Sequence, residues 1–421
     1  MKGNAPVSTV RPFQALRPRP ERAEEVASPP YDVLNTAEAR VLAEDRPYSF
    51  LRVVRPELEL EDGADPYSNE VYQRGSDNLR KFEEDGVLVR EEAPAFYLYR
   101  QIMGDHQQTG LVALASCQEY DEEIIRKHEF TRPDKEADRV RHISTLAAQT
   151  GPVWLTYEAV TSIDELVTAQ TSRMPDVDFV APDGIGHQIW YVTDEAAIAQ
   201  LQSDFAEQVE LLYVADGHHR SAAASLVAKE WREKHGVGPE HLSQFFLTVL
   251  YPHNQLQILP YNRFVHDLND RSRGEFFAQL QEDFEIEPRP EGENPSPPSA
   301  LQFDMVLEKQ WFRLTLKEGV LQTNDPVDSL DVSLLQERVL SRLLGIDDPR
   351  TAKRIEFIGG IRGHKELEKR VGEEGGVAFA CYPTSIEQLL AVAAAKRVMP
   401  PKSTWFEPKL RSGLFVHKLE R

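Results

Sequence analysis

The sequence predicts a mixed α/β fold of the α+β kind, with mixed sheets. Short apolar runs that suit strands are interspersed with longer segments of helical periodicity. Apolar residues make up 41% of 421 residues, which is enough for a sizeable core. At roughly 150 residues per domain, this length indicates two or three domains. We predict a main α/β domain over residues 1–268 and a C-terminal α+β region over residues 269–421, whose end (399–415) returns to the functional site of the first.

The first half of the chain is predicted to contain several strands and two long helices. Residues 28–33 read SPPYDV and must form a loop, because adjacent prolines fix φ and remove hydrogen-bond donors. We interpret Ser28 to Asp32 as a structured turn. Helices are predicted at residues 67–84 and 134–149, each followed by a glycine. Predicted strands are residues 13–16, 50–54, 95–100, 111–117, 153–157 and 188–192, the third and fourth of them paired.

The second half begins with a buried strand at residues 211–214 and a helix at 219–235 with one apolar face. Residues 288–298 read PRPEGENPSPP and predict an exposed connection, since they carry no apolar residue other than proline. The last helix is expected to have Thr384 as its N-cap and Glu387 in a capping box. The remaining predicted elements are hairpins at 245–259 and 303–316 and helices at 329–344 and 385–398.

Charge and composition exclude several classes of protein. The formal net charge of −21 repels nucleic-acid phosphates and anionic lipid, so we expect neither as a partner. No apolar run reaches about 18 residues, which argues against a membrane span. Cys117 and Cys381 are too few and too distant for a disulfide framework or a zinc ribbon. The first residues lack the apolar stretch of a signal peptide, so a cytoplasmic location is expected. The oligomeric state is not encoded in any pattern that we recognise.

The strongest functional signal is the run Asp216-Gly217-His218-His219-Arg220, between the predicted strand and helix. A helix start leaves N–H groups pointing outward and favours negative charge. Gly217 permits a close backbone approach to a ligand, and the Arg220 fork suits phosphate. Both histidines can donate to phosphate oxygens, bind metal or move protons, and Asp216 can serve as a base or a Mg²⁺ ligand.

The alternative for this run is structural, with Asp216 capping the helix and the histidines making ordinary hydrogen bonds. Four such residues at one turn favour function over that alternative. The spacing matches neither the Walker phosphate loop nor the dinucleotide fingerprint. The sequence therefore predicts a phosphate-handling site.

A second cluster, residues 128–139, reads HEFTRPDKEADR. Glu129 is a candidate general base, and His128 has no second histidine at the zincin spacing. Lys135 and Arg139 share one helical face at i, i+4. The alternative is a solvated loop followed by a charged helix start, and the residues alone do not decide between the two. The candidates for anion contacts in this cluster are Thr131, Arg132, Lys135 and Arg139.

A third cluster, residues 400–415, is basic and hydroxyl-bearing, at the end of an acidic chain. A basic segment of this kind could close over an anionic substrate. A C-terminal strand held by its aromatic side chains is the equally weighted alternative. The candidate substrate contacts are Lys402, Ser403, Lys409 and Arg411.

The three clusters together resemble a large bacterial family long described only as a domain of unknown function. The resemblance is carried by PPYDV at 29–33, HE-T at 128–131, ADGHHR at 215–220 and MPPKST-F-PK--SGL at 399–414. Some members look like pyrophosphate-dependent L-serine kinases. The DGHHR turn is also similar to the strand–turn–helix phosphate site of the ParB/sulfiredoxin fold, which includes nucleotide-dependent free-serine kinases.

This resemblance implies catalytic roles for Asp216 and His219, with Glu129 as the separate carboxylate. It implies a kinase that transfers a phosphoryl group from pyrophosphate or a nucleotide to a small metabolite, L-serine before others, giving O-phosphoserine. His128 and Thr131 are then expected at the substrate, and Mg²⁺ on Asp216. Two alternatives stay open. One is a metal-dependent hydrolase using Asp216, His218, His219 and His128, and the other is an inactive ParB-like protein that only binds a nucleotide or phosphate.

Overall fold

The computed structural model describes residues 8–61, 65–290 and 295–420, and these residues form two compact units. The first unit comprises Met1–Lys127, Thr131–Leu256 and Pro408–Arg421. The second comprises His128–Phe130 and Gln257–Glu407, so it is inserted into the chain of the first. The predicted mixed α/β fold is confirmed. The units divide after Leu256 rather than after residue 268, because the strand that begins at Tyr261 pairs within the second unit.

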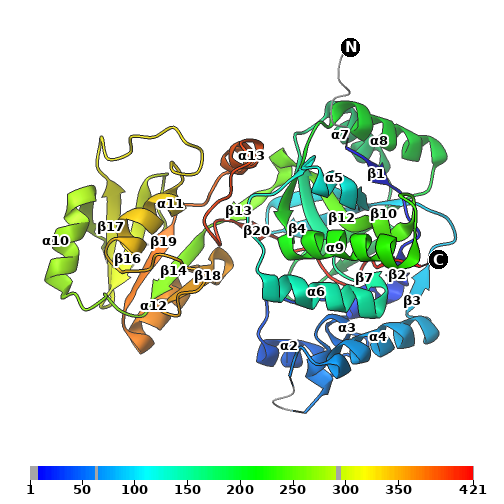
Figure 1. Ribbon diagram of the computed structural model, residues 1–421, viewed down its shortest axis with the longest axis horizontal. Coiled ribbons are helices and arrows are strands. Elements are labelled where there is room, and N and C mark those ends of the chain that lie inside the picture. The colour runs from blue at the N-terminus through cyan, green and yellow to red at the C-terminus, as the bar shows by residue number, and fades with distance from the viewer. Residues whose placement is uncertain (1–7, 62–64, 291–294, 421) are drawn as a thin grey trace. The chain divides into compact units, whose positions relative to one another are not determined.

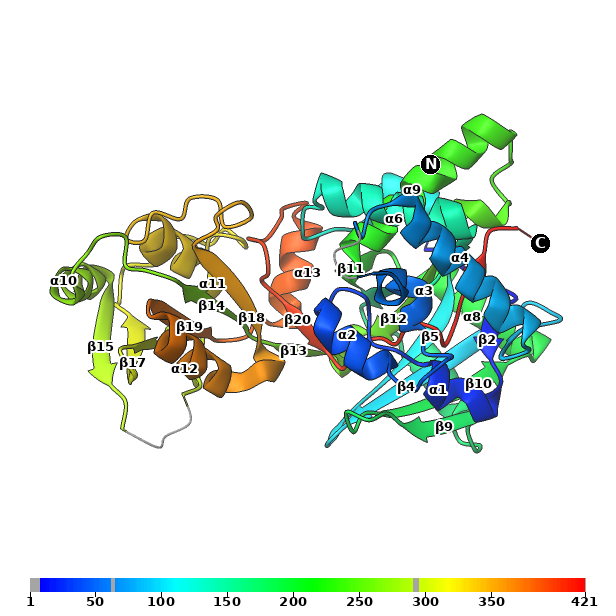
Figure 2. The ribbon, with the colours of Figure 1, turned by 90° about the horizontal axis from the view of Figure 1, so that it is seen from below.

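A nine-stranded mixed sheet forms the centre of the first unit. Its main order is β6-β11-β8-β12-β5-β4-β10-β9, and β1 pairs with β5. The antiparallel strands β4, β5 and β10 are seen in Figure 2. The predicted pairing of residues 95–100 with 111–117 is confirmed, with Leu98 opposite Leu111. The strands are β1 (Val10–Arg11), β4 (Phe96–Met103), β5 (His106–Ser116), β6 (Ile125–Arg126), β8 (Val153–Tyr157), β9 (Val177–Val180), β10 (Gly186–Val192), β11 (Leu212–Asp216) and β12 (Phe245–Pro252).

Helices cover this sheet, and α6 and α9 lie side by side (Figure 1). Two short ladders, β2 (Leu16–Pro18) with β3 (Leu88–Arg90) and β7 (Ala148–Gln149) with β21 (His417–Lys418), join distant parts of the chain. The helices are α1 (Ala23–Val26), α2 (Thr36–Ala43), α3 (Leu51–Val54), α4 (Asn69–Glu84), α5 (Cys117–Asp121), α6 (Pro133–Leu146), α7 (Thr161–Gln170), α8 (Glu195–Gln208) and α9 (His218–His235). The 3-10 helices are η1 (Pro20–Arg22), η2 (Pro56–Glu59), η3 (Leu242–Gln244) and η4 (His253–Gln255).

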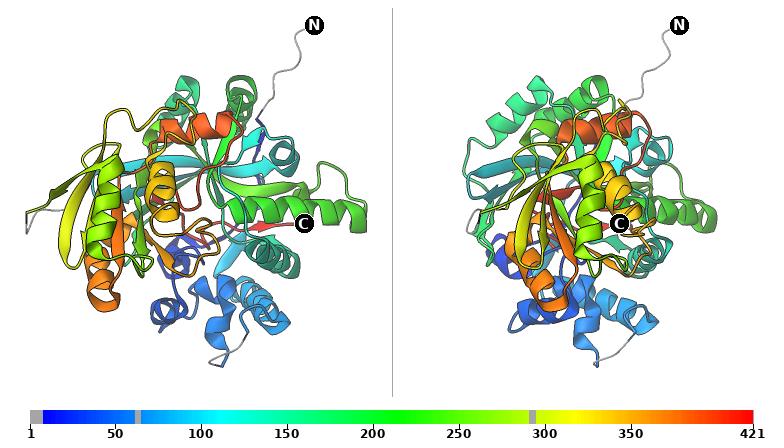
Figure 3. Two further views of the ribbon diagram at one scale, coloured as in Figure 1. Left: turned by 60° about the vertical axis from the view of Figure 1, so that its left-hand side comes forward. Right: turned by 90° about the vertical axis from the view of Figure 1, so that its left-hand side faces the viewer.

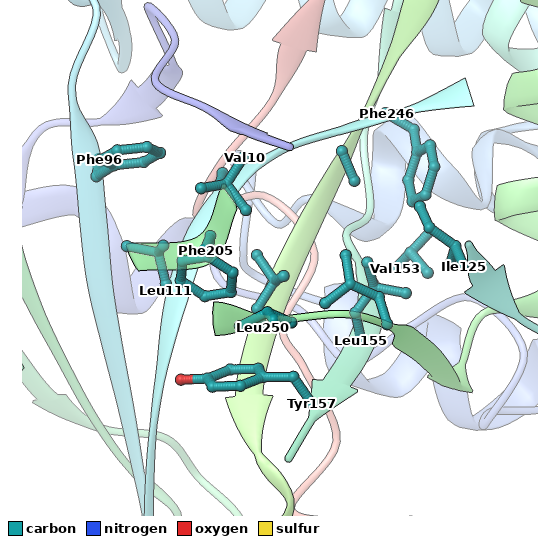
Figure 4. Close-up of a cluster of buried hydrophobic side chains, with 14 of the residues drawn as sticks. Val10, Phe96, Leu111, Ile125, Val153, Leu155, Tyr157, Phe205, Phe246 and Leu250 are labelled. Atoms are coloured by element: carbon teal, nitrogen blue, oxygen red, sulfur yellow. The ribbon is translucent and has the colours of Figure 1, made fainter. Parts of the chain in front are cut away.

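The main core of this unit lies between the sheet and its helices (Figure 4). Leu111 from β5, Leu155 from β8 and Leu250 from β12 are buried together with Phe205 of α8. Burying a leucine or phenylalanine contributes about 1.5–3 kcal/mol relative to exposure, so this cluster holds β8 and β11 rigidly. Both strands lead into the candidate site.

The second unit is built on a six-stranded sheet of order β15-β17-β16-β19-β14-β18. Helices α10 and α12 lie on opposite faces of it (Figure 3). Phe276 of α10 packs on one face and Leu367 of α12 on the other. The strands are β13 (Gln257–Leu259), β14 (Tyr261–Val265), β15 (Phe284–Pro288), β16 (Gln302–Leu307), β17 (Gln310–Leu316), β18 (Ile355–Gly359), β19 (Val377–Cys381) and β20 (Trp405–Glu407). The helices are α10 (Arg273–Asp283), α11 (Asp331–Leu335), a π-helix (η5, Gln336–Ser341), η6 (Gly360–Arg362), α12 (Gly363–Glu374) and α13 (Ile386–Ala394).

The predicted strand at residues 50–54 is wrong, because this segment forms helix α3. Its β-branched valines favour a strand by propensity, but Val53 and Val54 are buried in a cluster with Leu79 and Phe82 of α4. Tertiary packing of this kind overrides a weak local preference. The first predicted strand is displaced, since Phe13 forms only an isolated bridge between β1 and β2.

Two further expectations fail locally. The hairpin at residues 245–259 is absent from the described pairings, since β12 pairs with β5 and β8 whereas β13 pairs with β20. The chain leaves the first unit between β12 and β13, so these strands belong to different sheets. The N-cap of α13 is Ser385, with Gln388 completing the capping box, and Thr384 instead donates to the Ser403 carbonyl at 3.0 Å. The predicted connection 288–298 begins at the end of β15 and leads toward β16, with residues 291–294 outside the described range.

Across the described part of the chain, no helix has both the length and the apolar character that crossing a bilayer requires.

Candidate functional site

The turn between β11 and α9 places the Asp216–Arg220 run at a helix N-terminus. Strand β11 shifts register against β8 between Val214 and Asp216, which ends the regular pairing. Gly217 follows as the N-cap with φ of 95°, a conformation that favours glycine. Helix α9 then begins at His218. The first N–H groups of a helix have no intrahelical acceptor, so this turn directs backbone donors outward.

Asp216 is bridged to the end of the chain. Its Oδ2 accepts from Lys409 Nζ at 3.0 Å, and its Oδ1 accepts from the Gly217 N–H at 2.9 Å. The two charged side chains are 31% and 14% exposed, so water screens the pair only partly. Burial alone would raise the pKa of Asp216, but the charges of Lys409 and Arg220 outweigh it and hold this pKa well below its usual value. Asp216 is therefore a stable carboxylate and a weak base.

His218 and His219 occupy the first turn of α9 in different environments. His218 is buried, whereas His219 is half-buried. His219 Nε2 accepts the backbone N–H of Arg132 at 3.0 Å. An imidazole nitrogen that accepts a hydrogen bond carries no proton, so the neutral His219 has its proton on Nδ1. This contact joins the second predicted cluster to the first within one unit.

Arg220 points back toward the start of β8. Its Nη1 donates to the Pro152 carbonyl. A Cβ on Gly151 would lie 3.5 Å from Arg220 Nη1 and 3.4 Å from Ser412 Oγ, so this glycine leaves room for both side chains. Arg220 thus lines a small cavity instead of extending into solvent.

This cavity measures about 30 Å³ and is lined by Arg139, Arg220, Tyr31 and Ser412, among others. At roughly 10–15 Å³ for each water-sized group, it admits two or three oxygen atoms and not a whole pyrophosphate. The Arg139 guanidinium lies 4.0 Å from the centre of the Tyr31 ring and donates to Asp138 Oδ2 at 2.7 and 2.9 Å. Burial and the neighbouring Asp32 raise the pKa of Tyr31 to about 12, so its hydroxyl keeps its proton and remains a donor.

The other residues of the second cluster have partners at the surface of the first unit. Thr131 Oγ1 donates to Glu136 Oε2 at 2.8 Å. Lys135 Nζ donates to the Tyr67 hydroxyl at 3.0 Å, and the Arg132 guanidinium pairs with Asp134. Exposed pairs of this kind contribute about 0–1 kcal/mol and are readily exchanged for a ligand.

Arg411 is buried, and its guanidinium contacts two side chains of the first unit. It pairs with Asp183, and its Nε donates to His187 Nε2 at 3.2 Å. The Arg411 side chain is 6% exposed and both contacts already engage its guanidinium, so it is poorly available to a substrate. Its predicted role in substrate binding has no contact that supports it.

The remaining predicted site residues belong to the second unit. The His128 carbonyl accepts from the Met399 N–H at 2.8 Å, and Glu129 lines a pocket of about 400 Å³ in that unit. Lys402 adopts φ of 58° and its carbonyl accepts from Arg263 at 3.0 Å. Ser403 is buried and donates to the Pro400 carbonyl at 2.6 Å.

Sequence reasoning missed three residues that line the cavity. Tyr31 was interpreted as part of a structured turn, although its motif PPYDV was a usable signal. His142 and Ser412 also line the cavity, and neither was among the candidate residues, although Ser412 lies within the third predicted cluster. Only the fold brings residues 31, 142 and 412 together.

Comparisons with known proteins give a family and several remote structures. A family model described as "Protein of unknown function (DUF1015)" matches residues 10–333. No curated protein matches the chain. A conserved hypothetical protein from Pyrococcus furiosus is 12% identical, covers 73% of this chain and 95% of its own, and has a TM-score of 0.36. A free serine kinase in complex with AMP is 13% identical over 72% of this chain and 91% of its own, with a TM-score of 0.35. SbnI with a C-terminal truncation, from Staphylococcus aureus, is 12% identical over 72% and 86%, with a TM-score of 0.38.

Proposed function

The chain belongs to the DUF1015 family, whose description names no activity, and from its own site we propose that it is a phosphotransferase acting on a small metabolite. The proposed donor is pyrophosphate or a nucleotide, and the proposed acceptor is the hydroxyl of L-serine. The observation that carries this proposal is the gathering of cations at one helix N-terminus in a chain of net charge −21.

Lys409, Arg220 and Arg139 lie around a turn that also directs backbone N–H groups outward. Asp216 and Asp138 are the carboxylates paired with two of them. Among these five side chains the cations exceed the carboxylates by one. An acidic protein that concentrates cations and helix donors at one point is arranged to hold an anion.

In this proposal the donor phosphates bind the N–H groups at the start of α9, and Arg220 and Lys409 neutralise charge on the transferring group. Phosphoryl transfer depends mainly on positioning and charge stabilisation, and its loose transition state demands little from a base. The depressed pKa of Asp216 suits it to orient Lys409 rather than to accept a proton. His219 offers a donor through Nδ1. Glu129 belongs to the second unit, so its role as the acceptor of the hydroxyl proton stays a prediction from the sequence.

The predicted Mg²⁺ does not fit Asp216 as the structure has it. Lys409 Nζ stands 3.0 Å from Oδ2, which is where a divalent cation would be bound, and a cation this close repels the metal. We therefore assign no step to Mg²⁺ and keep it as a variable in the assay. A metal-dependent hydrolase would use Asp216 and His219 as metal ligands. In the structure Asp216 Oδ2 already accepts from Lys409 Nζ, and His219 Nε2 already accepts from the Arg132 N–H.

The decisive assay mixes the full chain with L-serine and pyrophosphate, ADP or ATP, each with and without Mg²⁺, and measures O-phosphoserine. We expect product with at least one donor. Arg220→Gln should lose most of the activity. Its matched control is Arg411→Lys, because Asp183 and His187 already engage that side chain. Absence of O-phosphoserine with every donor would contradict the proposed reaction. Phosphate binding without turnover would favour the inactive binding protein instead.

Gly217→Ala should weaken inorganic phosphate binding about tenfold. The φ of 95° is strained for alanine by roughly 1–2 kcal/mol, and relaxing it moves the N–H groups that hold the anion. Its Cβ would lie 3.4 Å from Val153 Cα, which adds no severe clash. Calorimetric titration with phosphate measures the change.

The control for that variant is Gly184→Ala, at φ of 83° with nothing within 4 Å of the new Cβ. It should lower the free energy of unfolding by a similar amount and leave phosphate binding unchanged. If both variants bind phosphate as the unmodified chain does, the turn at Gly217 is not the anion site.

A further inference from the structure

The second unit contains an acidic pocket of about 400 Å³ that the proposed reaction does not use as a phosphate site. This volume lies within the roughly 300–1,000 Å³ of small-molecule pockets. Its walls come from the π-helix, the loop after it and the segment around Met399. We call it the π-helix pocket.

Carboxylates dominate the charged groups of this pocket. They are Glu129, Asp328, Glu337, Asp347 and Asp348. The lining cation is Arg350, whose charge is matched by Asp348 at 2.9 Å. Like charges gathered around one hollow repel each other, and a cationic ligand relieves that repulsion.

A buried hydroxyl in the same pocket gives a second and independent sign of a ligand. Ser333 lines the pocket and is only 5% exposed. Among the described residues, its Oγ has no hydrogen-bond partner. Leaving a buried polar atom unsatisfied destabilises the folded chain, so a hydroxyl at this position is best explained by a donor or acceptor that a ligand supplies.

The backbone beside Ser333 is also unusual. The π-helix Gln336–Ser341 directly follows α11, and its Gln336 and Glu337 line the pocket. π-Helical turns are rare and are found frequently at functional sites. The turn brings the exposed carboxylate of Glu337 to the same hollow as the Ser333 hydroxyl.

The spacing of the carboxylates indicates an elongated ligand rather than a metal ion. Over the described residues, no three carboxylates of this pocket bring their oxygens within 4.8 Å of one another. A divalent cation needs several oxygen ligands at about 2.0–2.6 Å, which this spread does not provide. Separate ammonium groups joined by a chain could each meet a different carboxylate.

The rest of the lining is apolar and suits such a chain. Phe130, Val327, Val398 and Met399 form part of the wall, and Phe130 is 65% exposed. Methylene groups pack on aliphatic side chains, and an ammonium group is attracted to the face of an exposed aromatic ring. We propose that the π-helix pocket binds an aliphatic diamine or polyamine, with its ammonium groups on the carboxylates and one N–H on Ser333 Oγ.

This proposal does not depend on the phosphotransferase activity, because its test is binding. Calorimetric titration of the full chain with 1,4-diaminobutane, spermidine and butylamine at fixed salt is the experiment. We expect the diamine and spermidine to bind at least about tenfold more tightly than butylamine, because each added ammonium group gains an ion pair with a carboxylate of the pocket. Equal affinity for diamine and monoamine would overturn the proposal.

Charge-neutralising variants locate the binding in the pocket. Glu337→Gln and Asp347→Asn should each weaken diamine binding about five- to tenfold. Ser333→Ala should weaken it about two- to fivefold without loss of thermal stability, because the hydroxyl has no partner to lose. The matched control Glu373→Gln removes an exposed carboxylate of α12 outside the pocket and should change nothing.

Two outcomes would refute this assignment. Equal weakening by Glu373→Gln and Glu337→Gln would mean that the amine is attracted to the acidic surface as a whole. Tighter binding of Mg²⁺ or Ca²⁺ than of spermidine, lost in Glu337→Gln, would make the pocket a metal site.

Discussion

Asp216→Asn is expected to lower the rate of the proposed phosphoryl transfer by at least about 100-fold, with the protein still folded. The substitution keeps the shape of the side chain and removes the charge that fixes Lys409 Nζ at 3.0 Å. The asparagine amide oxygen can still accept a hydrogen bond from Lys409. Without the negative charge, however, the Lys409 ammonium group is no longer held at this position and can be hydrated instead. Steady-state measurement of O-phosphoserine formation gives the rate.

The stability cost of this variant should be small, about 1–2 kcal/mol, because Lys409 is 14% exposed and can turn toward water. The matched control is Asp194→Asn. Asp194 caps α8 by accepting the Ala197 N–H at 2.8 Å, and asparagine caps a helix equally well. Asp194→Asn should leave both rate and stability unchanged. A rate within a factor of three of the unmodified chain in Asp216→Asn would remove Asp216 from the mechanism.

The chain should lose about 4.5 kcal/mol of unfolding free energy between pH 7.5 and pH 5.0. Burial, with Arg139 nearby, lowers the pKa of His142 to about 3, and burial with Arg411 nearby lowers that of His187 to about 3. Burial likewise lowers the pKa of His417 to about 4. The unfolded chain therefore binds protons below about pH 6.5 that the folded chain does not, and stability falls as the pH falls.

Each of these histidines contributes a loss of about 2 kcal/mol at pH 5.0, given an unfolded pKa near 6.5. Asp331 acts in the opposite direction, since burial raises its pKa to about 6 and the folded chain takes up its proton first. That gain is only about 1.4 kcal/mol at pH 5.0, which is smaller than the combined loss from the three histidines, so the unfolding free energy still falls.

Urea unfolding at the two pH values measures this loss. His417→Gln, which keeps a side-chain donor for the Leu242 carbonyl, should reduce the loss by about 2 kcal/mol. Equal unfolding free energy at both pH values would show that these histidines are protonated in the folded chain.

The sequence predicted the fold class and most elements well because they depend on local periodicity. The pairing of β4 with β5 and the helix α9 follow from patterns that span ten residues or so. The helix α3 could not be predicted, because the burial of Val53 and Val54 against α4 decides its conformation. The separation of β12 from β13 depends on where the chain crosses to another unit, which no local pattern records.

The sequence indicated which residues carry chemistry at the site, but it did not indicate which side chains distant in the chain pair with one another. The turn at residues 216–220 is a strand-to-helix junction, as its composition indicated. The partner of Asp216 was within the third predicted cluster, but nothing distinguished Lys409 from Arg411, whose side chain is engaged elsewhere. Tyr31 was undervalued because a tyrosine after two prolines has an adequate structural explanation.

The ion pair between Lys409 and Asp216 also has a consequence for biosynthesis. These residues are 193 positions apart, so at about 5–20 residues per second the ribosome adds the lysine on the order of 10 to 40 s after the aspartate. Throughout that interval the nascent first unit also lacks β21, the strand that pairs with β7. The site is therefore assembled only once the entire second unit has been translated, and polypeptides released before residue 409 should have no activity.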